Sequence, residues 1–363
     1  MVLSNYPLRA ATIALAICCG ACTSRPQQGT LAPVAATDIA GTSLVPVLVA
    51  TTRKPLTDDA GEMFGSDRAE QVSYASITVS IPPDDARKIG EVQWPTSLPG
   101  DPQQNFVTVS ANELEQQSFV SALATAAKQN GRGKVLIFIH GFNNRFDEAV
   151  YRFAQIVHDS RAPATPVLFS WPSRGVLGLS AYQYDVENAK NSRKAVVQLL
   201  TTMAANANVK EINILCHSMG CLLTLEALWS MSSHSGKIAN KIKNVLLVAP
   251  DVDVNAFRAQ VPQMRAPRPR FALFLSQDDQ ALKLSKSISG GVTRLGDIDP
   301  DQEPYRGDFR REGVQVFDLT GLRGDAHSRA FDDVTSVMGM IERRLAEGQP
   351  MTDNNSTPVD ADR

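Results

Sequence analysis

The sequence predicts an α/β protein with one mostly parallel central sheet and helices on both of its faces. Short, nearly continuous apolar runs such as KVLIFIH (134–140) and NVLLVAP (244–250) are typical of strands buried on both faces of a parallel sheet. Amphipathic segments such as FDEAVYRFAQIVHD (146–159) separate these runs. Because strand and helix alternate along the chain, we expect a doubly wound sheet. A chain of 363 residues, 43% of them hydrophobic, can bury one large core of this kind.

The predicted elements follow one another between residues 46 and 345. Ser110 and Glu113 have the spacing of a capping box, which predicts a helix that reaches Lys128. Further helices are predicted at 146–159, 187–206, 220–231 and 329–345. Strands are predicted at 46–52, 73–81, 106–110, 134–140, 166–171, 211–216, 244–250, 271–276 and 314–319.

Residues 1–22 have the pattern of an export signal, with a positive amino end, a short apolar segment and small residues before Cys22. The Gly-Ala-Cys ending resembles the lipobox of bacterial lipoproteins, which implies that Cys22 is lipidated and becomes the mature N-terminus. Thr23 then favours an outer-membrane lipoprotein facing the periplasm, and the alternative is a soluble periplasmic protein. We expect a flexible tether at 23–45, one domain at 46–347 and a disordered tail at 348–363.

Ser218 stands between the strand-forming run EINILC (211–216) and the helix-forming run GCLLTLEALWSM (220–231). A strand, a sharp turn and a helix are the context of a nucleophile elbow, whose usual pattern is G-x-S-x-G. Here the pattern is Cys-His-Ser-Met-Gly, in which Cys216 replaces the first glycine. Ser218 is therefore the candidate nucleophile, and the alternative is a polar residue at the end of a strand.

A serine hydroxyl needs a base, and the order of the chain favours His327 among the five histidines. His327 lies in a glycine-punctuated loop directly after the last predicted strand, where the base of a Ser, Asp, His order belongs. Three carboxylates compete to orient it. Asp279 and Asp278 follow the penultimate strand, which is the usual place, and Asp251 follows the strand before it. Asp279 is favoured, with Asp278 second and Asp251 third.

An oxyanion hole needs two backbone N–H groups. The residue after the nucleophile, Met219, supplies one, and Phe142 in the segment IHGFNNRF (139–146) is the candidate for the other. Gly141 permits the close approach of backbone that this requires. His140 and Asn143 flank these residues and are candidate pocket residues.

The segment FSWPSRG follows another core strand at its catalytic end. Trp171 and Arg174 are therefore candidate pocket residues, although a rigid loop that closes the sheet explains them equally well. Tyr182, Tyr184 and Asp185 are expected to pack and cap the entry of the next helix.

The chain resembles a bacterial family of α/β-hydrolases of undefined physiological role, often described as esterase- or lipase-like. The resemblance implies the α/β-hydrolase fold over residues 45–345 and serine hydrolase chemistry, and it does not imply a substrate. The family's fixed second acidic position in S-x-N-D-x-A-L corresponds to Asp279. The segments that carry the resemblance are, in order, HGFNNRFDEAVYRFAQIVHD, FSWPSRG, CHSMGCLLTLEAL, VAPDVDVNAF and SQDDQALKLS.

These residues predict a serine hydrolase that cleaves small-molecule or lipid esters through an acyl-enzyme. The alternatives are an acyltransferase that uses the same intermediate, and a noncatalytic envelope binding protein on a hydrolase scaffold. The chemistry calls for no cofactor, and the histidines lack the spacing of a metal site. A net charge of -2 gives no reason to expect nucleic acid, and oligomeric state is left open.

Only Cys216 and Cys221 lie in the predicted mature body. An oxidising compartment permits a disulfide between them. Because one ends a strand and the other sits in the following helix, we expect two buried thiols instead.

Overall fold

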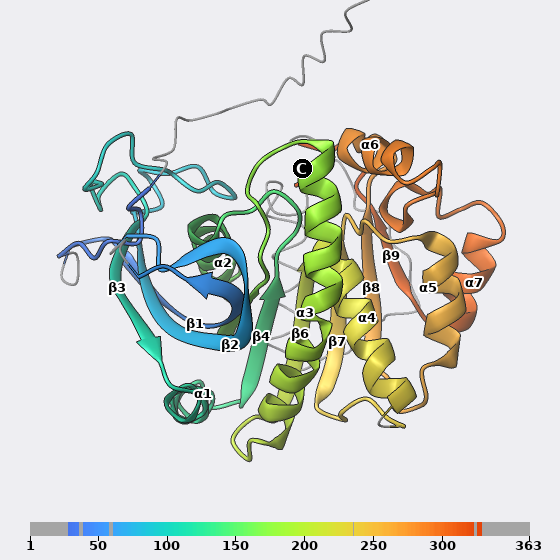
Figure 1. Cartoon of the computed structure of the whole chain (residues 1–363), viewed down its shortest axis with the longest axis horizontal. Helices are drawn as coiled ribbons and strands as arrows, with labels where there is room; N and C mark the ends of the chain where they lie inside the picture. The colour runs from blue at the N-terminus through green and yellow to red at the C-terminus, as the bar shows by residue number, and fades with distance from the viewer. Residues whose placement is uncertain (1–27, 36–38, 58–60, 235, 323–324, 329–363) are drawn as a thin grey trace, which may run out of the picture.

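The computed structural model describes residues 28–35, 39–57, 61–234, 236–322 and 325–328. The predicted signal with Cys22, the first part of the tether, the last helix and the tail lie outside these residues. Within them, nine strands form one sheet with helices on both faces, which confirms the predicted fold class (Figure 1). No helix in the described ranges is both long and apolar enough to cross a bilayer.

The helices and strands have the following bounds. The strands are β1 Ser43–Pro55, β2 Phe64–Ile81, β3 Val107–Leu114, β4 Lys134–Ile139, β5 Thr165–Ser170, β6 Glu211–His217, β7 Ile242–Val248, β8 Arg270–Leu275 and β9 Gln315–Asp318. The α-helices are α1 Gln116–Gln129, α2 Phe146–Ser160, α3 Leu179–Ala205, α4 Met219–His234, α5 Val254–Gln260, α6 Gln280–Ile288 and α7 Tyr305–Glu312.

The strand order is β3-β2-β1-β5-β4-β6-β7-β8-β9. β2 pairs antiparallel with β1 and β3, and every other pair is parallel. The carboxyl ends of β4, β5, β6, β7 and β8 therefore meet at one edge, where the loops of a parallel sheet build sites. We call it the carboxyl edge.

Each face of the sheet buries its own apolar cluster. Alternate residues of β4 point to opposite sides, so Ile137 and Ile139 join one cluster while Leu136 and Phe138 join the other. Helices α1, α3 and α4 cover the first face and α2 covers the second. In Figure 1, α3 and α4 run in front of β6 and β7. This double cover explains why the core strands are apolar almost throughout.

Two predicted helix starts are wrong. Ser110 and Glu113 do not cap a helix, because both pair with β2 inside β3, and α1 begins only at Gln116. Helix α3 begins at Leu179, eight residues before the predicted start at 187. Asp185 therefore lies within the helix and does not cap it.

Candidate active site

Ser218 occupies the turn between β6 and α4 with a positive φ of 49°. A non-glycine residue in this region costs about 1–3 kcal/mol, and such strain is common where a side chain must be presented for function. Backbone bonds hold the turn, since Ser218 N–H donates to Val248 O at 2.9 Å and Ser218 O accepts from Cys221 N–H at 3.0 Å. The geometry is that of a nucleophile elbow.

Two glycines let the elbow lie against the end of β4. A Cβ on Gly220 would lie 2.4 Å from the backbone oxygens of both Ile139 and His140. A Cβ on Gly141 would lie 3.0 Å from the Ser218 Cβ. Because backbone atoms cannot move aside as a flexible side chain can, position 220 requires glycine, whereas a side chain at position 141 would force its neighbours to shift slightly.

His327 and Asp279 form a hydrogen-bonded pair at the carboxyl edge. His327 Nδ1 lies 2.7 Å from Asp279 Oδ2. Asp279 is fully buried at the start of α6, where its Oδ1 also accepts the N–H of Leu282 at 3.0 Å. The carboxylate therefore orients the imidazole from a rigid position.

This pair shifts both pKa values in the direction of the charged forms. Burial alone lowers the pKa of His327, but the hydrogen bond and charge of Asp279 outweigh it and raise the pKa above 6.5. Burial raises the pKa of Asp279, but the hydrogen bond and charge of His327 outweigh it and hold the pKa below 3.8. An ionised Asp279 only accepts, so Nδ1 carries the proton and Nε2 is free to act as a base.

The two rival carboxylates have other partners. Asp278 accepts the Ser276 hydroxyl at 2.6 Å. Asp251 accepts the hydroxyls of Tyr182 at 2.9 Å and Ser285 at 2.5 Å. The Asp251 carboxylate also lies 3.3 Å from Arg294 Nε. Neither rival is hydrogen-bonded to His327 in the part of the chain that the structure describes, so the geometry favours Asp279.

Asp251 nevertheless borders the elbow. Its backbone N–H lies 3.2 Å from Ser218 O. Its partner Tyr182 packs edge-on against Phe142, with ring centroids 5.5 Å apart. Burial is the main cause that raises the pKa of Tyr182 to about 12, so its hydroxyl stays protonated and donates to Asp251.

His217 was not singled out from the sequence, yet its side chain meets His327. The two rings have centroids 4.8 Å apart, and His217 Nε2 lies 2.9 Å from His327 O. A carbonyl only accepts, so Nε2 carries a proton. Burial lowers the pKa of His217 to about 3, which keeps the ring neutral. His217 thus helps to hold the loop of His327 beside the elbow.

The structure brings Ser218, His327 and Asp279 to the same edge but does not join all three. Ser218 Oγ makes no hydrogen bond to His327, although both residues lie in the described ranges. Catalytic hydrogen bonds are often long or misaligned before a substrate binds.

The candidate oxyanion donors Phe142 and Met219 come from different elements, namely the loop after β4 and the start of α4. Neither N–H donates to an acceptor within the described residues. Met219 opens α4, where N–H groups are unpaired and the helix dipole favours negative charge. The Asn144 amide fixes the loop of Phe142 by donating to Phe142 O at 2.8 Å. Within the described residues, both N–H groups are therefore left without a backbone acceptor.

Arg53 organises the loops after β4 and β5, and no motif predicted this. Its guanidinium is buried, and burial lowers its pKa to about 10. Among the described residues it donates to neutral groups, namely Ser170 Oγ at 2.8 Å, Gly65 O at 3.1 Å, Ser173 O at 3.0 Å and Asn144 O at 2.7 Å.

Asp185 joins the same two loops from α3. It accepts the Ser173 hydroxyl at 2.5 Å, the Arg174 N–H at 2.9 Å and the Asn143 N–H at 3.4 Å. Burial raises the pKa of Asp185 above 3.8. Its role is to tie loops together, where we had expected helix capping.

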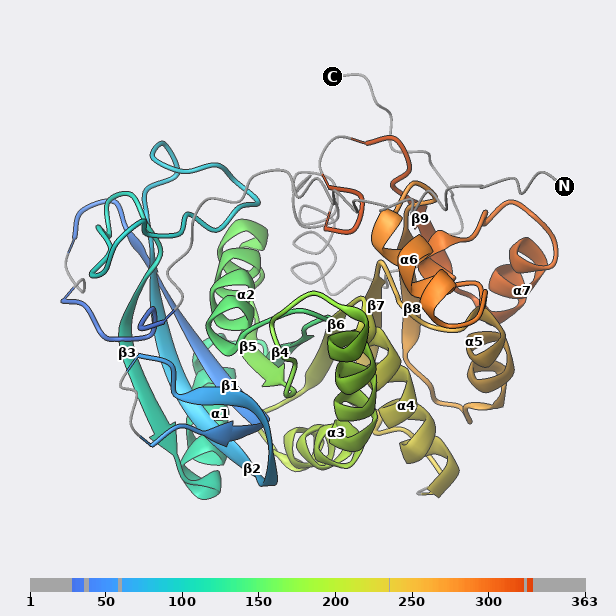
Figure 2. The ribbon, with the colours of Figure 1, turned by 45° about the horizontal axis from the view of Figure 1, so that its top comes forward.

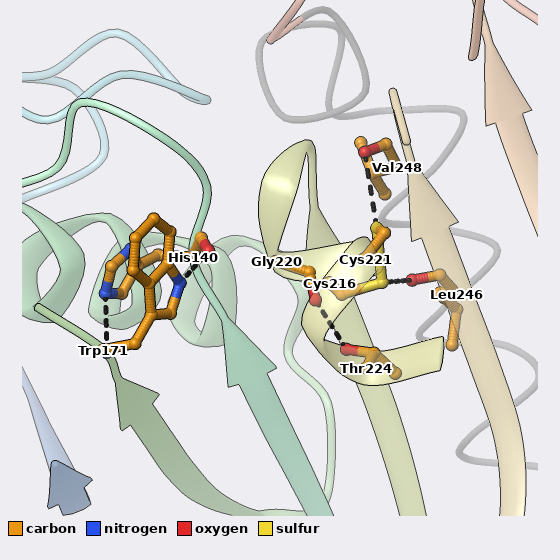
Figure 3. Close-up of a disulfide and its surroundings, with 8 residues drawn as sticks. All are labelled: His140, Trp171, Cys216, Gly220, Cys221, Thr224, Leu246 and Val248. Atoms are coloured by element: carbon orange, nitrogen blue, oxygen red, sulfur yellow. Dashed lines mark hydrogen bonds between the residues drawn. A yellow bond between two sulfur atoms is a disulfide. The ribbon is translucent and has the colours of Figure 1, made fainter. Parts of the chain in front are cut away.

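His140 and Trp171 form a buried stacked pair, drawn at the left of Figure 3. Their rings are 5.0 Å apart, and the indole N–H donates to His140 O at 2.8 Å. His140 Nδ1 donates to Gly141 O at 2.9 Å, and burial lowers the His140 pKa to about 3. Both rings are buried and pack within the protein, so neither faces an open pocket.

The other two candidate pocket residues lie in the loops themselves. Asn143 has a positive φ of 57°, a conformation that asparagine tolerates. The Arg174 side chain is exposed and lies over the Tyr184 ring, 4.1 Å from its centroid. Arg174 also lines a cavity of about 160 Å³ together with Arg53 and Arg145.

Cys216 and Cys221 form a disulfide, so the expectation of two thiols is wrong (Figure 3). The sharp turn folds α4 back over β6 and leaves the two Cα atoms 5.0 Å apart, which is within disulfide range. Cys216 Sγ lies 3.4 Å from Leu246 O and Cys221 Sγ lies 3.8 Å from Val248 O. Bridged sulfurs carry no hydrogen, so only reduced thiols would donate to these carbonyls.

The chain belongs to a family described as "Alpha/beta hydrolase of unknown function (DUF900)", whose model matches residues 115–344. The match agrees with the mostly parallel sheet and establishes the α/β-hydrolase fold. No curated protein sequence matches the chain. Within the described residues, no three His, Cys, Asp or Glu side chains are grouped as a metal site requires.

Solved structures of low identity are also similar. Brefeldin A esterase, described as a bacterial homologue of human hormone sensitive lipase, is 11% identical over 88% of this chain and 82% of that one, with a TM-score of 0.36. Carboxylesterase CesB from Bacillus subtilis is 6% identical over 63% of this chain and 99% of that one, with a TM-score of 0.33. An uncharacterized protein from Bacillus cereus is 11% identical, with a TM-score of 0.37. The similar part covers 55% of this chain and 57% of that protein. At these scores the likeness carries no argument about the reaction.

Proposed function

We propose that this protein is a serine hydrolase that cleaves carboxylic esters, with Ser218 as nucleophile, His327 as base and Asp279 as the orienting acid. The 2.7 Å hydrogen bond from His327 to Asp279, at the edge that carries the strained turn of Ser218, is the observation that supports it most. In a serine hydrolase, a buried carboxylate bonded to a histidine orients the imidazole and stabilises its charged form. A serine with a positive φ at a turn is presented for attack on a substrate.

The proposed reaction begins when His327 Nε2 takes the proton of the Ser218 hydroxyl. The Ser218 oxygen attacks the ester carbonyl, and the N–H groups of Phe142 and Met219 donate to the resulting oxyanion. The intermediate collapses to an acyl-enzyme as His327 protonates the leaving alcohol. Water, deprotonated by His327, then attacks the acyl carbon, and the acid is released as the bond to Ser218 Oγ breaks and His327 returns the proton to that oxygen.

Asp279 assists by stabilising the imidazolium that forms in each step. The raised pKa of His327 supports this role, because Asp279 is its main favourable neighbour. The same bond fixes the tautomer that leaves Nε2 unprotonated toward the nucleophile.

Hydrolysis of a series of nitrophenyl esters tests this proposal. The wild type is expected to turn over at least one short-chain ester, and Ser218→Ala should lose that activity while keeping its melting temperature. Full activity in Ser218→Ala would contradict the proposal. Accumulation of an acyl-enzyme that only an added alcohol or amine discharges would instead identify an acyltransferase.

We also propose that Cys22 carries a lipid that holds the protein at the outer membrane, facing the periplasm. The Gly-Ala-Cys sequence supports this, and the disulfide between Cys216 and Cys221 fits an oxidising compartment. Metabolic labelling with a palmitate analogue should tag the wild type and fail on Cys22→Ser. Equal labelling of both would contradict lipidation, and secretion of an unlabelled protein would indicate a soluble periplasmic form.

A further inference from the structure

An exposed apolar rim, made of Val176, Leu177, Leu179 and Leu284, lies at the carboxyl edge. Val176 and Leu177, just before α3, are 53% and 58% exposed, and Leu179 at the start of α3 is 55% exposed. Leu284 of α6 is 46% exposed. The described part of the chain exposes eight large apolar side chains, so half of them belong to these two elements. A Cβ on Gly178, between Leu177 and Leu179, would meet no atom within 4 Å, so the space beside this glycine is open.

The two elements that form the apolar rim touch each other next to the elbow. The Tyr182 hydroxyl, one turn after Leu179, lies 2.8 Å from the hydroxyl of Ser285, which follows Leu284. Tyr182 also donates to Asp251, whose backbone N–H meets Ser218 O. Figures 1 and 2 show the first turns of α3 beside α6. The apolar rim therefore lies next to the residues that surround the nucleophile.

Basic side chains flank the apolar rim, and one acidic side chain, Asp297, interacts electrostatically with two of them, Lys283 and Lys286. Arg174 and Lys283 are exposed, and Lys286 is partly exposed on the next turn of α6. Residues 174–182 and 280–288 contain no Asp or Glu. Because the whole chain has a net charge of -2, this basic surface is local. Exposed apolar side chains flanked by basic residues are typical of segments that enter the headgroup region of anionic lipids.

We propose that the apolar rim inserts into an anionic phospholipid surface and turns the carboxyl edge toward it, so that the esters cleaved are lipid esters taken from that surface. The membrane contact is independent of the chemistry and separate from a lipid on Cys22. The substrate class rests on the proposed hydrolase function.

Vesicle binding tests the contact without catalysis or the N-terminal lipid. The full chain carrying Cys22→Ser and Ser218→Ala is sedimented with phosphatidylglycerol vesicles, then again with Leu177→Asp and Leu179→Asp added. Ile89→Asp is the matched control, since Ile89 is 52% exposed and its neighbour Gly90 is bonded to Asp159 near the end of α2, away from the carboxyl edge. We expect binding to fall at least tenfold with the leucine changes and to be unchanged by the control.

The same leucine changes in the active protein distinguish an effect on membrane contact from an effect on ester cleavage. Hydrolysis of a water-soluble nitrophenyl ester should be unchanged, whereas hydrolysis of phospholipid in vesicles should fall at least tenfold. Equal vesicle binding by the leucine and Ile89 variants would overturn the proposal. A dimer in sedimentation velocity that only the leucine changes dissociate would assign the rim to a second copy and overturn it too. Vesicle binding by a wild type that cleaves no ester would refute the hydrolase function and leave the contact standing.

Discussion

The turn that carries Ser218 is held by neighbours in sequence and by adjacent strands, whereas the loops after β4 and β5 are held by residues far along the chain. At the turn, Gly220 and the Cys216–Cys221 disulfide act within three residues of the nucleophile. The loops depend on Arg53, 91 positions from its acceptor Asn144, and on Asp185 of α3, which accepts the N–H of Asn143 42 positions before it. A short motif can therefore reveal the nucleophile, while the surfaces that must face a substrate depend on distant partners.

Removal of the acid should have the largest effect on activity. Asp279→Asn keeps the shape of the side chain but favours the wrong tautomer of His327, and the equivalent change lowers kcat by about 10⁴ in serine proteases. Asp251→Asn is the control, because Asp251 borders the elbow but bonds to Tyr182 and Ser285. Ester turnover by the two variants checks this, and a larger loss in Asp251→Asn would reverse the assignment.

Arg53→Lys should loosen the loops and leave the elbow intact. A lysine cannot reproduce four hydrogen bonds to separate acceptors, and each bond from a charged group contributes about 1.5–3 kcal/mol. We expect kcat/KM to fall between about 10-fold and 100-fold through misplacement of Phe142. Fluorophosphonate labelling at saturation should still reach completion.

Arg68→Lys provides the comparison for this change, since Arg68 bonds only to Asn188 Oδ1 among the described residues. Near-normal kcat/KM is expected in that variant. If both arginine variants behave alike, the loops do not depend on Arg53 as described.

Replacing both cysteines by alanine should cost stability but little activity. The disulfide closes a loop with a sequence separation of only 5, for which chain entropy predicts a loss of about 2 kcal/mol. The backbone bonds of Ser218 to Val248 and Cys221 remain. Urea unfolding checks the stability, and a loss of ester turnover greater than the loss of folded protein would show that the bridge itself shapes the elbow.

The smallest expected effect is a shift in the pH dependence of kcat/KM when Asp279 is replaced by asparagine. His327 must be neutral to act as a base, and Asp279 raises its pKa above 6.5, so activity should be lost as pH falls through a value above 6.5. In Asp279→Asn the raising effect is removed while burial still lowers the pKa. The acid limb of the profile should therefore move to lower pH, and an unmoved limb would mean that another group titrates.

The sequence predicted the core strands and the candidate triad because both have local patterns. Buried strands such as β4 and β6 are continuous apolar runs, and Ser218 lies in a strand–turn–helix motif. The ordering of the acids also followed from strand position, and Asp279 is the carboxylate that meets His327. These predictions needed no knowledge of tertiary contacts.

The predictions that were wrong, and the residues that were missed, depend on contacts that local sequence patterns do not reveal. Ser110 and Glu113 have capping-box spacing, but pairing with β2 extends β3 through them. The disulfide depends on how far α4 folds back, which spacing alone does not reveal. In the sequence, Arg53 comes directly after an apolar run, as many surface cations do. Only its burial in the folded protein reveals its structural role. His217 was similarly hidden, because its contact with His327 crosses 110 positions.

Covalent labelling of Ser218 tests the central claim most directly, because a serine reacts with a fluorophosphonate only when a base activates it. The label should appear on the peptide that contains Cys216 to Cys221, and Ser218→Ala should abolish it without lowering the melting temperature. His327→Ala should suppress labelling almost as strongly, and the double variant should lose little more, since triad members act as a unit. Labelling of another serine, or equal labelling of wild type and Ser218→Ala, would contradict the account.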